Sequence, residues 1–230
     1  MTQGLMQNPG SPVSSTTKAS EINSKSDPRP SPPFVAALWL RRFLPLLLLL
    51  LAALSLVGLY FGNRYWIHRF DPIIQRQAAI YRLDPKLVWS VIYQETYFQT
   101  AKIGEADEVG LMQITPLVAR EWAKETGIGD FEEQIARDHI AVLREPERNV
   151  QIGCWYLEKL GERYRDSPAP EARVLAAYNA GASRVSEWDK VPEGAPSLSE
   201  NEFISRIDIR TTRAYVTEIL QRYRSLQSNR

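Results

Sequence analysis

The feature that most constrains this chain is an uninterrupted apolar run, FLPLLLLLLAALSLVGLYF, at residues 43–61. These nineteen residues carry no charge. A transmembrane helix needs about 20 consecutive apolar residues to cross a hydrocarbon core. A buried helix of a globular domain fits the run less well, because such a helix is seldom apolar on every side. The run therefore predicts a single transmembrane helix.

A cleaved signal peptide is the alternative to an uncleaved anchor. The segment before the apolar run is long, and no Ala-x-Ala cleavage site closes the run. Both features favour an anchor that stays in the mature protein. Basic residues stand on both sides of the run, so the positive-inside rule gives only a weak orientation.

The apolar run divides the chain into four segments. Residues 1–42 start with a stretch rich in Ser, Pro, Thr and Asn, a composition that predicts a disordered tail. Residues 43–61 are the anchor, and residues 62–70 are a short linker. Residues 71–230 are then expected to form one folded domain.

Charge and composition exclude several classes of function. Twenty-eight basic and 27 acidic residues give a net charge of +1, without the basic footprint of a nucleic-acid-binding protein. Cys154 is the single cysteine, and His68 and His139 stand far apart without ligand spacing. The sequence therefore predicts no internal disulfide, no metal site and no nucleic-acid partner.

Helical signals run through the expected domain. Asp84 followed by Pro85, and Thr115 followed by Pro116, each place an N-cap residue before a proline at the first helical position. No long alternating segment with hairpin turns is present. The pattern predicts an all-α bundle around a cleft. Further helical spacing of apolar residues occurs at 149–164, 171–181 and 211–226.

One carboxylate interrupts an apolar helical face. In VWSVIYQETYF, residues 88–98, Glu95 lies in line with Val88 and Val91. Removing an unpaired charge from water is costly, so such a glutamate indicates an error in the helix prediction, a paired structural ion or a catalyst. In an apolar cleft its pKa rises, and it can stay protonated as a general acid near neutral pH. Glu95 is therefore a candidate catalytic acid.

Four short motifs extend this interpretation. They are QETYF at 94–98, GLMQITP at 110–116, AAYNAG at 176–181 and RTTRAYV at 210–216. Together they resemble the lytic transglycosylase domain of the soluble, lysozyme-like (SLT) type, glycoside hydrolase family 23, over about residues 71–226. The resemblance implies an all-α, lysozyme-like fold of the goose-type/lytic transglycosylase kind, with a substrate cleft.

The resemblance also assigns roles to individual residues. The family's catalytic glutamate falls on Glu95, Gly110 would let the backbone turn beside the sugar chain, and Leu111 and Met112 read as core packing. No cofactor and no metal is implied. The residues expected to contact or hold the substrate are Thr96, Gln113, Tyr178, Asn179 and Tyr215.

The fourth motif departs from the family pattern. The family commonly has proline where this chain has Asp208, and glutamate where it has Thr211. The missing carboxylate puts in doubt any contact that it would make across the cleft. Two other carboxylates, Asp107 and Glu108, lie in a polar loop, where solvated surface charge is the simpler interpretation.

The implied activity is non-hydrolytic cleavage of the β-1,4 bond between N-acetylmuramic acid and N-acetylglucosamine in peptidoglycan, giving 1,6-anhydro ends. The glycan strands would be the substrate, and the membrane would be contacted through the one N-terminal helix. That substrate places the chain in the inner membrane, single-pass, with its domain on the periplasmic side. The sequence does not identify any further partner in the cell envelope. The alternatives are a goose-type lysozyme, which is a hydrolase, and a non-catalytic wall-binding scaffold.

Overall fold

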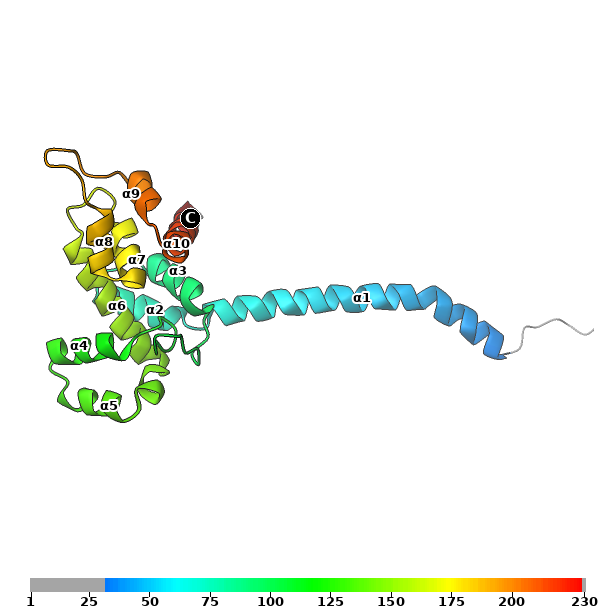
Figure 1. Ribbon diagram of the computed structural model, residues 1–230. Coiled ribbons are helices and arrows are strands. Elements are labelled where there is room, and N and C mark those ends of the chain that lie inside the picture. The colour runs from blue at the N-terminus through cyan, green and yellow to red at the C-terminus, as the bar shows by residue number, and fades with distance from the viewer. Residues whose placement is uncertain (1–31, 229–230) are drawn as a thin grey trace, which may run out of the picture. The chain divides into compact units, whose positions relative to one another are not determined.

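The computed structural model describes residues 32–228, and within that range the secondary structure is helical apart from isolated β-bridges around Val109 (Figure 1). The predicted all-α class is confirmed. The helices are α1 (Pro32–His68), α2 (Asp71–Ile80), α3 (Pro85–Thr96), α4 (Pro116–Thr126), α5 (Gly129–Leu143), α6 (Pro146–Arg163), α7 (Pro170–Ala180), α8 (Ala182–Trp188), α9 (Glu200–Arg206) and α10 (Arg210–Ser228).

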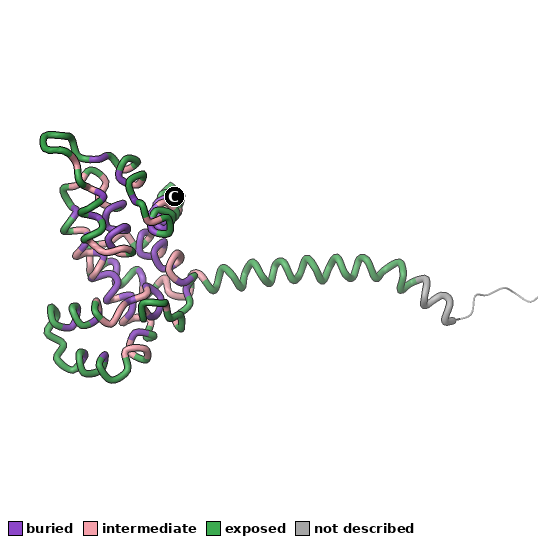
Figure 2. The backbone as a smooth tube through the Cα atoms, in the orientation of Figure 1, coloured by how far each residue is buried: buried purple, intermediate pink, exposed green. Residues whose placement is uncertain are grey.

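Helix α1 contains the apolar run and is longer than the expected span. It is the one helix in the described range that is long and apolar enough to cross a membrane. Its apolar side chains from Trp39 to Tyr65 are exposed (Figure 2). Prolines at its first turn are compatible with a helix start, and the following alanines and leucines favour helix.

The expected boundaries on either side of the run therefore need correction. The tail was expected to reach residue 42, but residues 32–42 are helical, while residues 1–31 lie outside the described range. The linker expected at 62–70 is helical up to His68. Gly62 and Asn63, which follow the run and are residue types typical of helix ends, lie inside α1, so neither these residues nor hydropathy marks the helix end here.

Helix α6 is the central helix of the domain and packs against α2, α4, α5 and α7. The expected apolar face at Val150, Cys154, Leu157 and Leu160 is buried. Figure 2 shows buried backbone concentrated in α3, α6 and α7, with exposed segments around them. The core thus lies between the helices that carry the four motifs.

Helix α3 is fixed at its start by the predicted cap. The Asp84 side chain accepts a hydrogen bond from the Lys86 backbone N–H at 2.8 Å and another from the Tyr223 hydroxyl of α10 at 2.9 Å. The Thr115 cap of α4 is confirmed in the same way, since its hydroxyl accepts from Val118 N at 3.3 Å. Because α10 packs along both α3 and α7, these three helices hold the side chains of the site.

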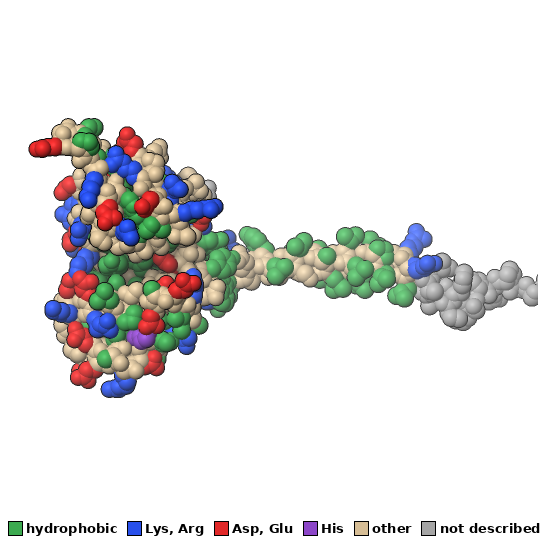
Figure 3. All heavy atoms as spheres, in the orientation of Figure 1, with side chains coloured by type: hydrophobic (Ala, Val, Ile, Leu, Met, Phe, Trp, Pro, Cys, Tyr) green, Lys and Arg blue, Asp and Glu red, His purple; other side chains and the backbone are tan. Residues whose placement is uncertain are grey.

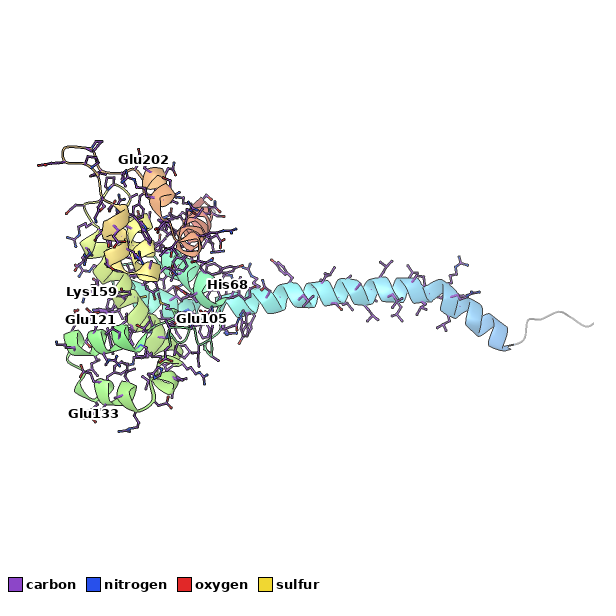
Figure 4. The ribbon with its side chains drawn as sticks, viewed as in Figure 1. His68, Glu105, Glu121, Glu133, Lys159 and Glu202 are labelled. Atoms are coloured by element: carbon purple, nitrogen blue, oxygen red, sulfur yellow. The ribbon has the colours of Figure 1, made fainter. Side chains whose placement is uncertain are left out.

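Two groups of helices flank the site. In Figure 3 the surface is hollowed between the part that contains α8 to α10 and the part that contains α4 and α5, and hydrophobic side chains gather in the hollow. Lys159 connects α6 to α4, because its ammonium lies 2.9 Å from a carboxylate oxygen of Glu121 (Figure 4).

Candidate active site

Glu95 lies at the end of α3, one residue before the helix stops, and its side chain is largely buried. The Tyr215 hydroxyl donates to its Oε1 at 2.6 Å. Burial raises the pKa of Glu95 to about 7 and outweighs the opposing effects of the Tyr215 hydrogen bond and the Lys102 charge. The carboxyl is therefore partly protonated at neutral pH, as a general acid requires.

The structure does not support the alternative role for Glu95, that of a structural ion paired with a basic side chain. The nearest basic group, the Lys102 ammonium, donates to the Glu95 backbone carbonyl. Among the described residues no basic side chain forms an ion pair with the Glu95 carboxylate. An unpaired carboxyl at this depth is costly to keep, which is typical of a functional group.

The Thr96 side chain lies inside the protein, and its expected substrate contact stays a prediction. The residue is 3% exposed. Its hydroxyl lies 3.0 Å from the Leu111 carbonyl and 3.3 Å from the Ile92 carbonyl, both of which can accept from it. Thr96 therefore connects the end of α3 to the GLMQ turn through a hydrogen bond that its hydroxyl makes inside the protein.

The GLMQ turn is held by packing against α6. Leu111 and Met112 are fully buried, which confirms them as core residues. Gly110 has a φ of +81°, and a Cβ there would lie 2.4 Å from Asn149 Nδ2 and 2.5 Å from the Leu143 carbonyl. The reason for a glycine at 110 is thus this close internal contact, and not only an approach to a sugar chain.

Asn149, at the start of α6, is a site residue that the sequence analysis missed. It is fully buried. Its Nδ2 donates to the carbonyls of Val109 and Leu143 at 2.8 Å each, and its Oδ1 accepts from Met112 N at 2.7 Å. A polar side chain on the buried face of a predicted helix is the signal that could have identified Asn149, just as it identified Glu95.

Gln113 also supports the turn. Its φ is +49°, and its Nε2 donates to the carbonyls of Gly110 at 3.0 Å and Lys102 at 3.2 Å. These two bonds engage both N–H groups of the amide. A substrate contact by Gln113, which stays a prediction, would therefore use its Oε1 or follow a rearrangement.

Tyr178 and Asn179 come from the end of α7. The Tyr178 hydroxyl donates to the Met112 carbonyl at 2.8 Å, and burial, with a smaller contribution from the nearby Glu95 charge, raises the pKa of that phenol well above its usual value. Asn179 is exposed, and its Oδ1 accepts from the Thr212 hydroxyl at 2.7 Å. The structure therefore brings Tyr178 near the Glu95 carboxyl, and the substrate contacts expected of Tyr178 and Asn179 stay predictions.

The two departures in the fourth motif have different surroundings. Asp208 accepts a hydrogen bond from the indole N–H of Trp188 at 2.9 Å, so it anchors α8 to the start of α10. Thr211, at the position of the family's glutamate, is exposed on the first turn of α10. Tyr215, one turn further along α10, contacts Glu95. This residue, which matches the family motif, therefore lies at the site.

Asp107 and Glu108 are not equivalent. Asp107 is exposed, and its carboxylate lies 2.9 Å from His139, which agrees with solvated surface charge. Glu108 is partly buried with its side chain against Gly104, and its charge adds to the rise in the Glu95 pKa. The surface interpretation is therefore wrong for Glu108.

Replacing Tyr215 with Phe should move the pH dependence of the site upward. The Tyr215 hydrogen bond favours the charged form of Glu95, so its loss raises the pKa of Glu95 above about 7. We expect the falling limb of the pH–rate profile to shift to higher pH, by up to about one unit for a lost hydrogen bond to a charged group. A limb that stays in place or moves downward would contradict this arrangement.

The helical architecture and the site together define an all-α domain with a largely buried carboxyl at the end of α3. Residues 72–197, more than half of the chain, match the transglycosylase SLT domain, and the chain belongs to this family.

Curated relatives share this part of the chain. The membrane-bound lytic murein transglycosylase F of Desulfosudis oleivorans is 29% identical over 152 residues, which are 59% of this chain and 30% of the relative. A putative soluble lytic murein transglycosylase of Haemophilus influenzae is 30% identical over 133 residues, or 57% of this chain and 20% of the relative. The chain thus spans about a third or less of the length of these relatives.

Solved structures confirm the fold. The lytic transglycosylase Slt of Pseudomonas aeruginosa matches with a TM-score of 0.58 at 22% identity, over 72% of this chain and 25% of that protein. The 70 kDa soluble lytic transglycosylase of Escherichia coli matches with a TM-score of 0.53 at 22% identity, over 69% of this chain and 24% of that protein.

Proposed function

We propose that this chain is a membrane-anchored peptidoglycan lytic transglycosylase that cleaves the β-1,4 bond between N-acetylmuramic acid and N-acetylglucosamine. The observation that carries the proposal is the buried, unpaired Glu95 carboxyl with a pKa of about 7 in an SLT-family domain. The names of the relatives, which are lytic murein transglycosylases, support the substrate.

Glu95 would act twice in one turnover. As a general acid it protonates the leaving O4 of N-acetylglucosamine while oxocarbenium character develops at C1 of the muramic sugar. The resulting carboxylate then takes the proton of the C6 hydroxyl of the same muramic sugar, whose oxygen bonds to C1. The proton is returned to Glu95, a 1,6-anhydro ring is formed, and no water is consumed.

The environment of Glu95 suits both steps. Burial raises the pKa of Glu95, so the carboxyl is protonated for the first step. The Tyr215 hydroxyl then stabilises the carboxylate that exists before the second step. The C6 hydroxyl is tethered to the reacting sugar, so its effective concentration is high without a water molecule held by the protein.

Digestion of purified sacculi tests the activity. We expect the purified chain to release soluble glycan fragments, faster at slightly acidic pH than at pH 8, because Glu95 must begin each turnover protonated. Binding to sacculi without release of fragments would overturn the proposal in favour of a wall-binding scaffold.

The proposed location is the inner membrane, with the domain on the periplasmic side. Membrane attachment is supported by α1 and by membrane-bound relatives, and the side follows from the proposed substrate. We expect the chain to fractionate with the inner membrane at a mass that includes residues 43–61. A soluble product that starts after this run would show that it is a signal peptide.

A further inference from the structure

The turn that ends α3, directly after Glu95, has an unusual backbone. Tyr97 has φ and ψ of 50° and 44°, and Phe98 has a φ of 62°. Two successive residues with side chains in the left-handed region are disfavoured sterically. Such a conformation persists only where the surrounding structure holds it.

The end of α1 and the turn after it stabilise this backbone conformation. The indole N–H of Trp66 donates to the Tyr97 carbonyl at 2.8 Å, and the Arg69 guanidinium donates to the Phe98 carbonyl at 2.6 Å. The Tyr97 hydroxyl donates in turn to the Asn63 side chain. Carbonyls at a helix C-terminus have no partner within the helix, and here a segment about 30 residues earlier supplies two donors.

This segment is itself attached to α3. The Arg69 guanidinium stacks on the Trp66 ring, 3.3 Å from its centroid, so the two donors support each other. The Trp89 indole N–H of α3 donates to the Ile67 carbonyl at 3.1 Å, and the Trp89 ring packs at 5.2 Å from that of Phe98. Figure 4 shows His68, the last residue of α1, beside α2 and α3.

Glu95 depends on this turn for its position. It is two residues before Tyr97, and Phe98 is fully buried below the site. If the turn relaxed into right-handed backbone, α3 would continue and Phe98 would leave its place in the core. The direction of the last helical residues, and with it the carboxyl, would change.

We propose that Trp66 and Arg69 are positioning residues for Glu95, so that the segment joining the apolar helix to the domain forms part of the support of the active site. The inference rests on the proposed function for its catalytic consequence. The two donor residues, Trp66 and Arg69, lie outside the four family motifs, and the carbonyls that they bond belong to the QETYF motif.

Two substitutions in the full-length chain test the inference. Trp66→Phe and Arg69→Met each remove one donor, while Tyr65→Phe and Arg64→Met are matched controls at exposed positions of the same segment. We expect the first pair to lower kcat about tenfold with little change in KM, because misplacement of a reacting group by an ångström or less has effects of this size or larger. The controls should match wild type, and Arg69→Lys, which keeps a donor, should restore part of the rate.

The pH–rate profile separates positioning from a general loss of structure. Loosening the turn admits water to Glu95, so the falling limb should move to lower pH in Trp66→Phe and Arg69→Met. The groups that set the Glu95 pKa from neighbouring elements are unchanged by these substitutions. They are Tyr215 of α10, and Lys102 and Glu108 of the loop before α4. Tyr178 of α7, whose own pKa is raised in part by the Glu95 charge, is also unchanged.

A direct titration of the carboxyl by ¹³C NMR, assigned with Glu95→Gln, gives a readout that needs no turnover. A lowered pKa of Glu95 in both variants, at unchanged circular dichroism and melting temperature, supports the inference. An unchanged pKa together with wild-type kcat overturns it. If wild type itself releases no glycan, the proposed function fails, and an unchanged or lowered pKa still decides the positioning role.

Discussion

Glu95→Gln should reduce turnover on purified sacculi by about three orders of magnitude or more, while folding and wall binding stay intact. The amide has nearly the same shape and can still accept the Tyr215 hydrogen bond, but it cannot transfer a proton to the leaving oxygen. Loss of general acid–base catalysis costs typically 10²- to 10⁴-fold, and here one group serves both steps.

The matched control is Glu105→Gln, an exposed glutamate in the loop after α3 (Figure 4). We expect it to digest sacculi at the wild-type rate. If Glu95→Gln also retained a rate near that of wild type, the assignment of the acid would be wrong.

The same substitution has a pH-dependent effect on stability. The folded-state pKa of Glu95 is raised from 4.5 to about 7, so the folded protein holds a proton that the unfolded chain releases. Wild type therefore loses free energy of unfolding as pH rises from about 4.5 to 7, by about 3 kcal/mol, at 1.36 kcal/mol per pKa unit. Glu95→Gln lacks this loss, so its advantage in melting temperature should grow over that range and be constant above it.

Asn149→Ala should be the most destabilising single change at the site. It removes all three hydrogen bonds of the buried amide and leaves Met112 N and the carbonyls of Val109 and Leu143 without that partner. Unsatisfied buried backbone groups cost about 1–3 kcal/mol each, so we expect a loss of about 3–5 kcal/mol and most of the activity.

Chemical denaturation measures this loss. Asn201→Ala, at an exposed position in α9, is the control and should unfold like wild type. Because Asn149 fixes the backbone of the GLMQ turn, a variant that is rescued in stability by low temperature should still turn over slowly. A free energy of unfolding within 1 kcal/mol of wild type would mean that this amide does not hold the turn.

The sequence was sufficient for those parts of the fold that depend on local chemistry. The caps at Asp84 and Thr115, the buried face of α6 and the all-α class follow from helix signals and periodicity. The position of Glu95 on an apolar face likewise indicated the raised pKa that the structure shows.

The parts that the sequence did not predict depend on contacts between distant segments. Thr96 was assigned to the substrate by its place in a motif, although its hydroxyl is buried against Leu111. Asn149 and Trp66 each bond a turn that is far away in the sequence, and no local pattern identifies which turn each of them bonds. Glu108 sits in a polar loop whose folding, not its composition, buries part of the side chain.

The central claim, that Glu95 directs an intramolecular attack and not a hydrolysis, is tested most directly by digesting peptidoglycan in ¹⁸O-labelled water and weighing the muropeptides. The account predicts 1,6-anhydro-N-acetylmuramic acid ends, lighter by one water than hydrolysis products and without ¹⁸O. Reducing ends that carry ¹⁸O as the main product would contradict it and favour a goose-type lysozyme activity. In that case Glu108, the second carboxylate that influences Glu95, would be the first residue to replace as the base for water.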